Sequence, residues 1–230
     1  MADLRPPRKT KLFRESRAVL EIAYFLFKFP RLPKQPCGIG KTVITIPGFM
    51  ASDISFYFLR KYLHQLGYKA LGWGMGRNFD KAEKLLPRII DLIIRESSQN
   101  SHLLFLIGWS YGGFLAREAA REVPEMVDKI ITLGSPVVGG PKYTVVAGMF
   151  KKRGYDLDTI EQEIEARNEI PLNIPVAAIY TKKDGIVAWQ ACIDEHNPNV
   201  EHIEVKTTHI GLCYSAEVFE IITEQLAAVN

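Results

Sequence analysis

One serine in this 230-residue chain stands where a hydroxyl contributes little to packing. Ser110 lies between an apolar run and a helix-like run, with Gly108 two residues before it and Gly112 two residues after it. Glycines at both positions are typical of a backbone turn that is too tight for side chains. The pattern Gly-x-Ser-x-Gly therefore predicts a sharp strand-to-helix turn that presents the serine oxygen as a nucleophile. The alternative is a tight turn without chemistry.

A serine hydroxyl is a weak nucleophile, so it needs a histidine as base and a carboxylate that orients this histidine. Where the serine occupies such a turn, the acid is expected later in the chain and the histidine after the acid. Asp184 follows the apolar run 174–181, and His209 follows the last strand-like run. The sequence therefore predicts Ser110 as nucleophile, Asp184 as acid and His209 as base.

Other histidines and acids are poorer candidates because of their positions. The other histidines precede the serine, or lie before or within the last strand-like run. Four acids lie in polar or helix-like stretches that are typical of caps and solvated faces. These rivals are His64, His102, His196, His202, Asp156, Asp158, Asp194 and Glu195. For Asp184 itself the alternative is an ordinary Asp-Gly turn.

Acyl transfer places negative charge on a carbonyl oxygen, and two backbone N–H groups must stabilise that charge. Tyr111, the residue after the serine, is expected to supply one of them. The other is expected from the loop after the first strand-like run, where either Phe49 or Met50 follows Gly48; we favour Phe49. The alternative for Pro47-Gly48 is that it only ends the strand.

Six apolar runs alternate along the chain with helix-like segments. Runs that are apolar on both faces are typical of parallel strands covered by helices on each side. They occupy residues 42–48, 68–74, 102–108, 128–136, 174–181 and 200–206. We therefore predict an α/β fold with a mostly parallel sheet of about six strands and helices on both faces, in a single domain over residues 1–230.

The segments between the strands predict helices. Ser52 and Asp80 are placed to cap the first two, and Pro87 is expected to bend or divide the second. Residues 137–172 are more numerous than a plain crossover needs. We expect a short helical lid insertion there that covers the site, with a crossover in two helices as the alternative.

The N-terminal segment 1–36 differs from the rest of the chain in charge. It carries nine Lys or Arg against three Asp or Glu, whereas the remaining residues carry 20 basic and 23 acidic side chains. Because the rest of the chain has no basic excess, we expect no nucleic-acid partner.

Within this segment, residues 18–29 form an apolar run that Glu21 interrupts, and no small-residue cleavage site follows. The run is too short for a membrane span. It predicts a helix packed on the core or, alternatively, an amphipathic helix in peripheral contact with a membrane.

The chain has three cysteines, Cys37, Cys192 and Cys213, without a Cys-x-x-Cys spacing. An odd number of cysteines in this arrangement fits neither a disulfide framework nor a zinc site. We therefore expect a reducing, cytoplasmic location, with membrane association through the N-terminal segment as the alternative.

Over residues 40–230 the chain resembles the α/β-hydrolase superfamily, and within it the compact bacterial lipases and esterases. Pro-Gly-Phe stands where those enzymes carry a His-Gly pair and an oxyanion residue, so Pro47 departs from the pattern. Gly-Trp-Ser-Tyr-Gly-Gly matches their nucleophile turn, Thr-Leu-Gly-Ser-Pro the strand before the lid, and Lys-Lys-Asp-Gly-Ile-Val and His-Ile-Gly-Leu the acid and base loops. Residues 72–78 are similar to a lipase-like subgroup, in which Arg77 and Asn78 are expected to brace loops near the site.

The resemblance implies hydrolysis of a small-molecule or lipid ester through an acyl-enzyme intermediate, without metal or organic cofactor. In the expected lid, four apolar residues face an acyl chain or, alternatively, belong to the core: Val145, Val146, Met149 and Phe150. Two other functions stay open. One is a thioesterase or acyltransferase of the same fold, and the other is a non-catalytic protein that binds a ligand.

Overall fold

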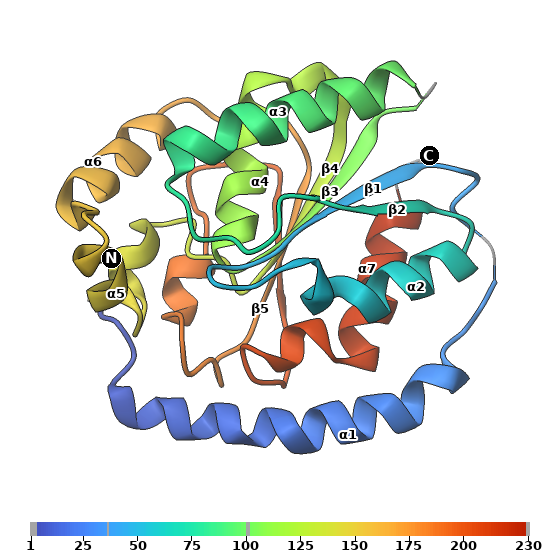
Figure 1. Ribbon diagram of the computed structural model, residues 1–230, viewed down its shortest axis with the longest axis horizontal. Helices are drawn as coiled ribbons and strands as arrows, with labels where there is room; N and C mark the ends of the chain where they lie inside the picture. Colours follow the sequence, from blue (N-terminus) through green and yellow to red (C-terminus); the bar gives the residue numbers. More distant parts are fainter. Residues whose placement is uncertain (1–3, 36, 100–101, 229–230) are drawn as a thin grey trace.

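The computed structural model describes residues 4–35, 37–99 and 102–228. In these ranges six strands form one sheet in the order β2-β1-β3-β4-β5-β6, and every neighbouring pair is parallel (Figure 1). Each of the six predicted runs overlaps one strand, so the predicted sheet is confirmed. The strands are β1 Thr42–Ile46, β2 Lys69–Gly72, β3 Leu104–Trp109, β4 Val127–Leu133, β5 Val176–Tyr180 and β6 Val200–Glu204.

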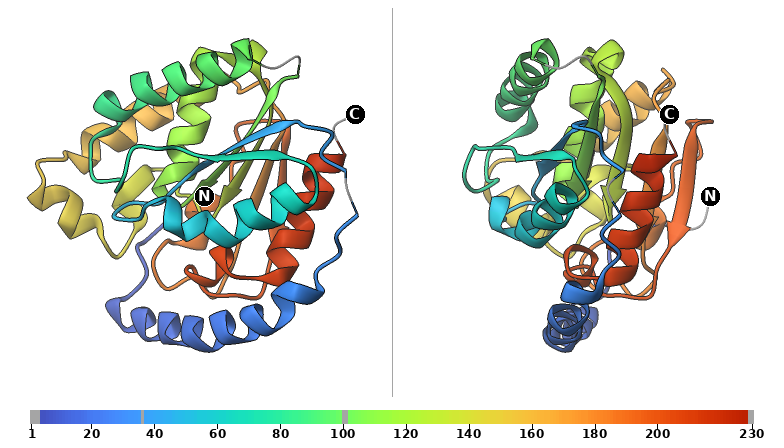
Figure 2. Two further views of the ribbon diagram at one scale, coloured as in Figure 1. Left: turned by 45° about the vertical axis from the view of Figure 1, so that its right-hand side comes forward. Right: turned by 90° about the vertical axis from the view of Figure 1, so that its right-hand side faces the viewer.

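Helices cover both faces of the sheet, as predicted (Figure 2). The helices on the first face are α1 Ala18–Lys28, α2 Tyr57–Gln65 and α7 Ala216–Ala227. Those on the second face are α3 Ala82–Ser98, α4 Tyr111–Glu122 and α6 Leu157–Asn168. Alternate residues of β3 enter the two cores, Phe105 the first and Leu106 the second. Both faces of β1, β3, β4 and β5 are therefore largely buried, which explains their continuous apolar runs. The edge strands β2 and β6 are partly exposed.

The remaining helical elements are short. Residues 137–172 contain α5 Ala147–Lys152 and α6, preceded by one of the 3-10 turns. These turns are η1 Lys9–Arg17, η2 Phe29–Arg31, η3 Asp53–Phe56, η4 Pro124–Met126, η5 Gly140–Tyr143, η6 Trp189–Cys192 and η7 Gly211–Cys213. The predicted insertion is thus helical, and its role as a lid stays a prediction.

Two expected helix caps are absent, and Pro87 does not divide its helix. Ser52 precedes η3 without a side-chain cap hydrogen bond, and Asp80 lies one residue too early to cap α3, whose N-cap is Lys81. The Asp80 carboxylate instead pairs with Lys84 at 2.9 Å. Pro87 lies inside α3 without dividing it, since the buried apolar side chains around it, such as Leu85 and Ile89, hold the helix on the sheet.

The N-terminal strap, residues 9–31, comprises η1, α1 and η2 and lies along the outside of the molecule, at the bottom of Figure 1. Residues 1–3 and 36 of the predicted segment 1–36, and also 100–101 and 229–230 of the domain predicted over 1–230, lie outside the described residues. Within the described ranges, every helix is too short or too polar to cross a bilayer.

Glycine allows α4 to approach the sheet closely. A Cβ atom on Gly112 would lie 2.1 Å from the carbonyl oxygen of Ile46, at the end of β1, and one on Gly108 would lie 2.4 Å from the carbonyl oxygen of Gly112. These distances are far shorter than a van der Waals contact. The two glycines of the Ser110 turn are therefore required by packing, since neither has a positive φ.

We predict that Gly112→Ala lowers the free energy of unfolding by about 1 to 3 kcal/mol or more, because the added methyl group overlaps β1. The matched control is Gly148→Ala in α5, where an added Cβ meets nothing within 4 Å. This control is expected to preserve stability or raise it by up to ~1 kcal/mol. Urea unfolding measures both. Equal stability of the two variants would contradict the packing argument.

Candidate active site

Ser110 occupies the turn between β3 and α4 with a strained backbone. Its φ of 55° and ψ of −124° lie in a region that residues with a side chain rarely adopt. The Ser110 N–H donates to the carbonyl oxygen of Leu133, at 2.8 Å, which ties the turn to the end of β4. The side chain is partly exposed. The predicted sharp strand-to-helix turn is confirmed, and it presents the hydroxyl at the carboxyl edge of the sheet.

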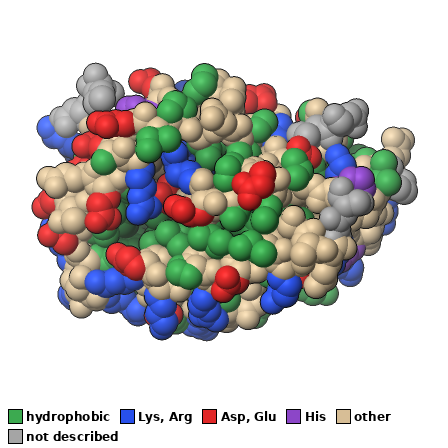
Figure 3. All heavy atoms as spheres, turned by 90° about the horizontal axis from the view of Figure 1, so that it is seen from above, with side chains coloured by type: hydrophobic (Ala, Val, Ile, Leu, Met, Phe, Trp, Pro, Cys, Tyr) green, Lys and Arg blue, Asp and Glu red, His purple; other side chains and the backbone are tan. Residues whose placement is uncertain are grey.

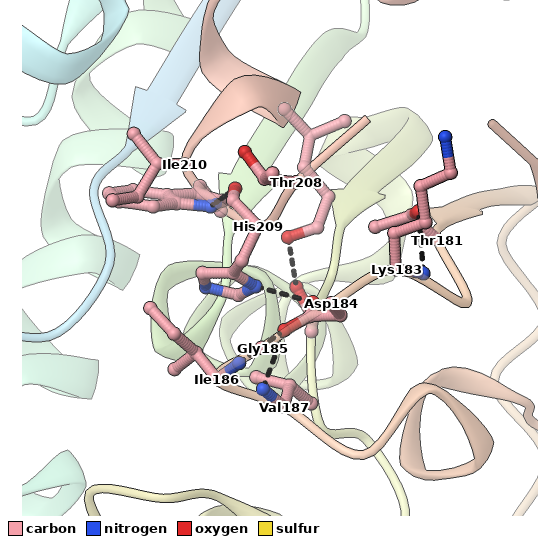
Figure 4. Close-up of polar contacts among 12 residues, drawn as sticks. Thr181, Lys183, Asp184, Gly185, Ile186, Val187, Thr208, His209 and Ile210 are labelled. Carbon is pink, nitrogen blue, oxygen red and sulfur yellow. Dashed lines mark hydrogen bonds and ion pairs between the residues drawn. The ribbon is translucent and has the colours of Figure 1, made fainter. Parts of the chain in front are cut away.

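Asp184 and His209 are in direct contact, although 25 residues separate them. The Asp184 Oδ2 atom lies 2.6 Å from His209 Nδ1, and both side chains are buried. The other carboxylate oxygen accepts the N–H groups of Ile186, at 2.8 Å, and Val187, at 2.7 Å (Figure 4). These bonds fix the carboxylate, so that one oxygen remains directed at the imidazole.

The imidazole of His209 lies beside the Ser110 turn. The indole Nε1 of Trp109, the residue before the serine, donates to the His209 carbonyl at 3.1 Å, and the two rings are 5.3 Å apart. On the β4 side, a Cβ atom on Gly134 would lie 3.0 Å from His209 Nδ1. Gly134 directly follows Leu133, which accepts the Ser110 N–H. The ends of β3, β4, β5 and β6 therefore converge on one site.

The electrostatic surroundings of His209 favour its protonated form. Burial lowers the pKa of the imidazole, whereas the carboxylates of Asp184 and Glu15 raise it, and the net pKa is raised above the ordinary 6.5. A raised pKa makes the imidazole a stronger base, which is the property that activation of a hydroxyl requires.

The loop after β1 lies against the serine. A Cβ atom on Gly48 would lie 3.2 Å from Ser110 Cβ. Asn78 is buried and braces this loop. Its side-chain Nδ2 donates to the Pro47 carbonyl at 2.8 Å, and its backbone carbonyl accepts the Met50 N–H at 2.7 Å. The expected brace is confirmed for Asn78, whereas the side chain of Arg77 is exposed.

The helical insertion contacts both sides of this site. Phe150 of α5 is buried, and its ring stacks on that of Phe49 at 4.2 Å. Val145 N–H donates to the Ile186 carbonyl in the acid loop at 2.9 Å. Val145 and Val146 are half-buried and Met149 is exposed. Phe150 thus belongs to a small core beside the loop after β1, which agrees with the alternative interpretation of that residue.

A cavity of about 180 Å³ lies between α3, α4 and α6, with apolar and charged side chains in its lining. Tyr111, the residue after the serine, lines it together with Leu86, Phe114 and Tyr155. These helices lie on the side of the molecule seen in Figure 3, where a band of apolar side chains runs between charged ones. The cavity thus reaches the residue after the serine, whereas Ser110, Asp184 and His209 do not line it.

Two glutamates of the N-terminal strap, which sequence analysis did not place in the site, bind the acid and base loops. Buried Glu15 accepts the N–H groups of Gly185, at 2.9 Å, His209, at 3.2 Å, and Ile210, at 3.0 Å.

Glu21 accepts the hydroxyls of Thr207, at 2.9 Å, and Thr208, at 2.6 Å. The available signal was that Glu21 lies four residues before the apolar Phe25, on the same face of a helix.

The rival candidates lie away from this site. Asp194 is buried and pairs with the buried Arg117, so it is not a solvated acid as expected. Asp156 caps α6, as expected. His202 accepts the N–H of Asp194 at 2.9 Å, and His64, His102 and His196 are exposed.

No metal site is visible in the part of the chain that the structure describes. There, no three His, Cys, Asp or Glu side chains are grouped so that they would hold a metal ion. The three cysteines are free. The absence of a cofactor and the cytoplasmic location stay predictions.

Comparison with protein families gives one match. The PGAP1-like alpha/beta domain family matches residues 68–153, which include the Ser110 turn. A sequence comparison with curated proteins gives no match.

Solved structures with the same fold are numerous. A metagenome-derived lipolytic enzyme, of the LipS and LipT pair, is 17% identical with a TM-score of 0.65 over 86% of this chain and 98% of that chain. The lipase BlEst2 of Bacillus licheniformis is 14% identical with a TM-score of 0.63 over 84% and 94%. The monoacylglycerol lipase of Paleococcus ferrophilus is 13% identical with a TM-score of 0.62 over 86% and 98%. These similarities confirm the resemblance to the α/β-hydrolase superfamily at the level of the fold.

We predict that Glu15→Gln lowers the pKa of His209, because it removes one of the two carboxylates that raise it. It is also expected to cost about 1 to 3 kcal/mol of stability, because three backbone N–H groups lose a charged acceptor. NMR titration of the imidazole and urea unfolding measure the two effects. Glu21→Gln, which changes the contacts to Thr207 and Thr208, is the matched control and should leave the pKa of His209 unchanged. A shift that is equal in both variants would contradict a specific effect of Glu15.

Proposed function

We propose that this chain of α/β-hydrolase fold is a serine hydrolase that cleaves carboxylic esters, with Ser110 as nucleophile, His209 as base and Asp184 as the acid that orients it. The observation that carries the proposal is the buried 2.6 Å contact between Asp184 and His209, at the sheet edge where Ser110 occupies a strained turn. Each of the three side chains follows the carboxyl end of a strand, which is where catalytic groups of α/β sheets gather.

The reaction proceeds in two acyl transfers. His209 Nε2 takes the hydroxyl proton as Ser110 Oγ bonds to the ester carbonyl carbon, and the carbonyl oxygen becomes an oxyanion. The tetrahedral intermediate collapses, and the alcohol leaves with the proton from His209. Water then gives a proton to His209 and attacks the acyl-enzyme. Collapse of the second intermediate returns that proton to Ser110 Oγ and releases the carboxylic acid.

The backbone N–H groups of Phe49 and Tyr111 are proposed to bind the oxyanion. Tyr111 is the first residue of α4, so its N–H has no carbonyl partner within the helix. The N–H of Met50, the alternative to Phe49, donates to Asn78. In the described part of the chain no hydrogen bond occupies the Phe49 N–H, which supports Phe49 as the second donor.

The apolar surroundings favour an acyl ester with a hydrocarbon chain. Tyr111 lines the cavity between α3, α4 and α6, and the α5 segment with Phe150 lies over Phe49. The structural relatives include lipolytic enzymes and a monoacylglycerol lipase, which is consistent with a carboxylesterase or lipase-like activity. The insertion 137–172 is proposed to act as the lid. The same residues would act on a thioester, so a thioester belongs in the substrate test.

We predict that a fluorophosphonate probe labels Ser110 in the folded protein and that Ser110→Ala abolishes both labelling and hydrolysis of p-nitrophenyl esters. Mass spectrometry of the labelled peptide locates the adduct. A panel of p-nitrophenyl and thioester substrates of increasing chain length then defines the acyl group. A folded wild-type protein that forms no adduct would contradict the proposal and favour a ligand-binding protein.

We predict that kcat/KM falls with decreasing pH through a midpoint above 6.5, because the base must be neutral and the pKa of His209 is raised. Asp184→Asn is expected to move this midpoint to lower pH, because it removes the main carboxylate that raises the pKa of His209 while burial still lowers it. The same change is expected to reduce kcat about 10⁴-fold. Asp156→Asn, at the cap of α6, is the control for an acid outside the site and should keep the wild-type midpoint. The same midpoint in the Asp184 variant would exclude His209 as its source.

A further inference from the structure

The outward face of the N-terminal strap is apolar. Seven of the fifteen exposed large hydrophobic side chains in the described residues belong to it, although it spans only residues 9–31. Phe13 is 81% exposed, Leu20 72% and Phe27 60%; the others are Leu12, Val19, Tyr24 and Leu26. Leu20, Tyr24 and Phe27 are spaced by four and three residues in α1, so they form one stripe of the helix.

The inward face of the strap is already occupied. Phe25 is buried against the first core, where its ring packs on Phe219 of α7 at 5.0 Å. Glu15 and Glu21 on this side bind the loops that carry Asp184 and His209. The strap therefore packs on the core through its other side, and its outward apolar stripe stays exposed. An exposed apolar patch of this kind marks a docking surface.

The strap carries an excess of positive charge. Both of its acids, Glu15 and Glu21, bind backbone and hydroxyl groups of the site loops. The strap also carries six cations: Lys9, Lys11, Arg14, Arg17, Lys28 and Arg31. Two of them lie over aromatic rings of the stripe, Arg31 over Phe27 at 4.2 Å and Lys28 over Tyr24 at 5.6 Å.

We propose that the outward face of the N-terminal strap binds an anionic lipid surface, with the apolar stripe in the headgroup and acyl boundary and the cations on lipid phosphates and carboxylates. A helix with an apolar face flanked by Lys and Arg binds such a surface by burial and by charge together. A second copy of this chain is a poorer partner, because pairing two straps would bring like charges together. Since the strap also holds the Asp184 and His209 loops, the bilayer would lie on the side of the molecule that carries them.

The test is flotation of the purified full chain with vesicles of phosphatidylcholine containing about 30% phosphatidylserine, compared with phosphatidylcholine alone. The chain is expected to float with the anionic vesicles, and the bound fraction should fall as the salt concentration rises. Because the readout is binding rather than activity, it does not depend on the proposed ester hydrolysis.

Two pairs of variants separate the contributions. The combined change Leu20→Ser and Phe27→Ser is expected to weaken binding at least tenfold, whereas Ile94→Ser and Ile170→Ser, on exposed residues outside the strap, should not change it. The combined change Arg14→Gln and Arg17→Gln should weaken binding about thirtyfold, whereas Lys61→Gln and Arg88→Gln, on exposed cations elsewhere, should not. Circular dichroism and urea unfolding check that each variant folds as the wild type does.

Three results would overturn the proposal. One is that the full chain fails to float with anionic vesicles. Another is that strap variants and control variants bind alike. The third is that the strap variant converts an oligomer to a monomer without loss of vesicle binding, which would assign the apolar stripe to a second copy of this chain.

Discussion

The buried hydrogen bond between Asp184 and His209 is the contact on which the arrangement of the site depends. A carboxylate without access to water is tolerated only if its oxygens are satisfied, and Asp184 achieves this with the imidazole and with the N–H groups of Ile186 and Val187. The bond joins the loops after β5 and β6. It also fixes the tautomer and orientation of the ring beside the Ser110 turn.

Two further constraints keep this pair next to the serine. A parallel sheet collects the ends of its strands at one edge, and the strained Ser110 turn is held there by the close packing of Gly112 on β1. The N-terminal strap closes the site from outside, because Glu15 satisfies N–H groups on both the acid loop and the base loop. The N-terminal strap, which is far from residues 184 and 209 in the sequence, is thus a structural part of the site.

Much of this arrangement follows from the sequence because its signals are local. The apolar runs indicate parallel strands, and the glycines around Ser110 indicate the turn. The roles of Glu15 and Glu21 depend on contacts with residues more than 160 positions away, and an acid in an amphipathic helix usually lies in solvent. The predicted division at Pro87 and the predicted cap at Asp80 were wrong for a related reason: packing on the sheet, rather than local preference, decides where α3 begins and whether it continues.

In the proposed reaction, three side chains and two backbone N–H groups converge on one reacting carbon. A crystal structure of the protein inactivated by a phosphonate ester would show these groups around the adduct. We predict phosphorus bonded to Ser110 Oγ, with the phosphoryl oxygen about 3 Å from the N–H groups of Phe49 and Tyr111. His209 Nε2 should lie within hydrogen-bond distance of an ester oxygen. A phosphoryl oxygen bound by other donors, or an imidazole directed away from the adduct, would contradict the account.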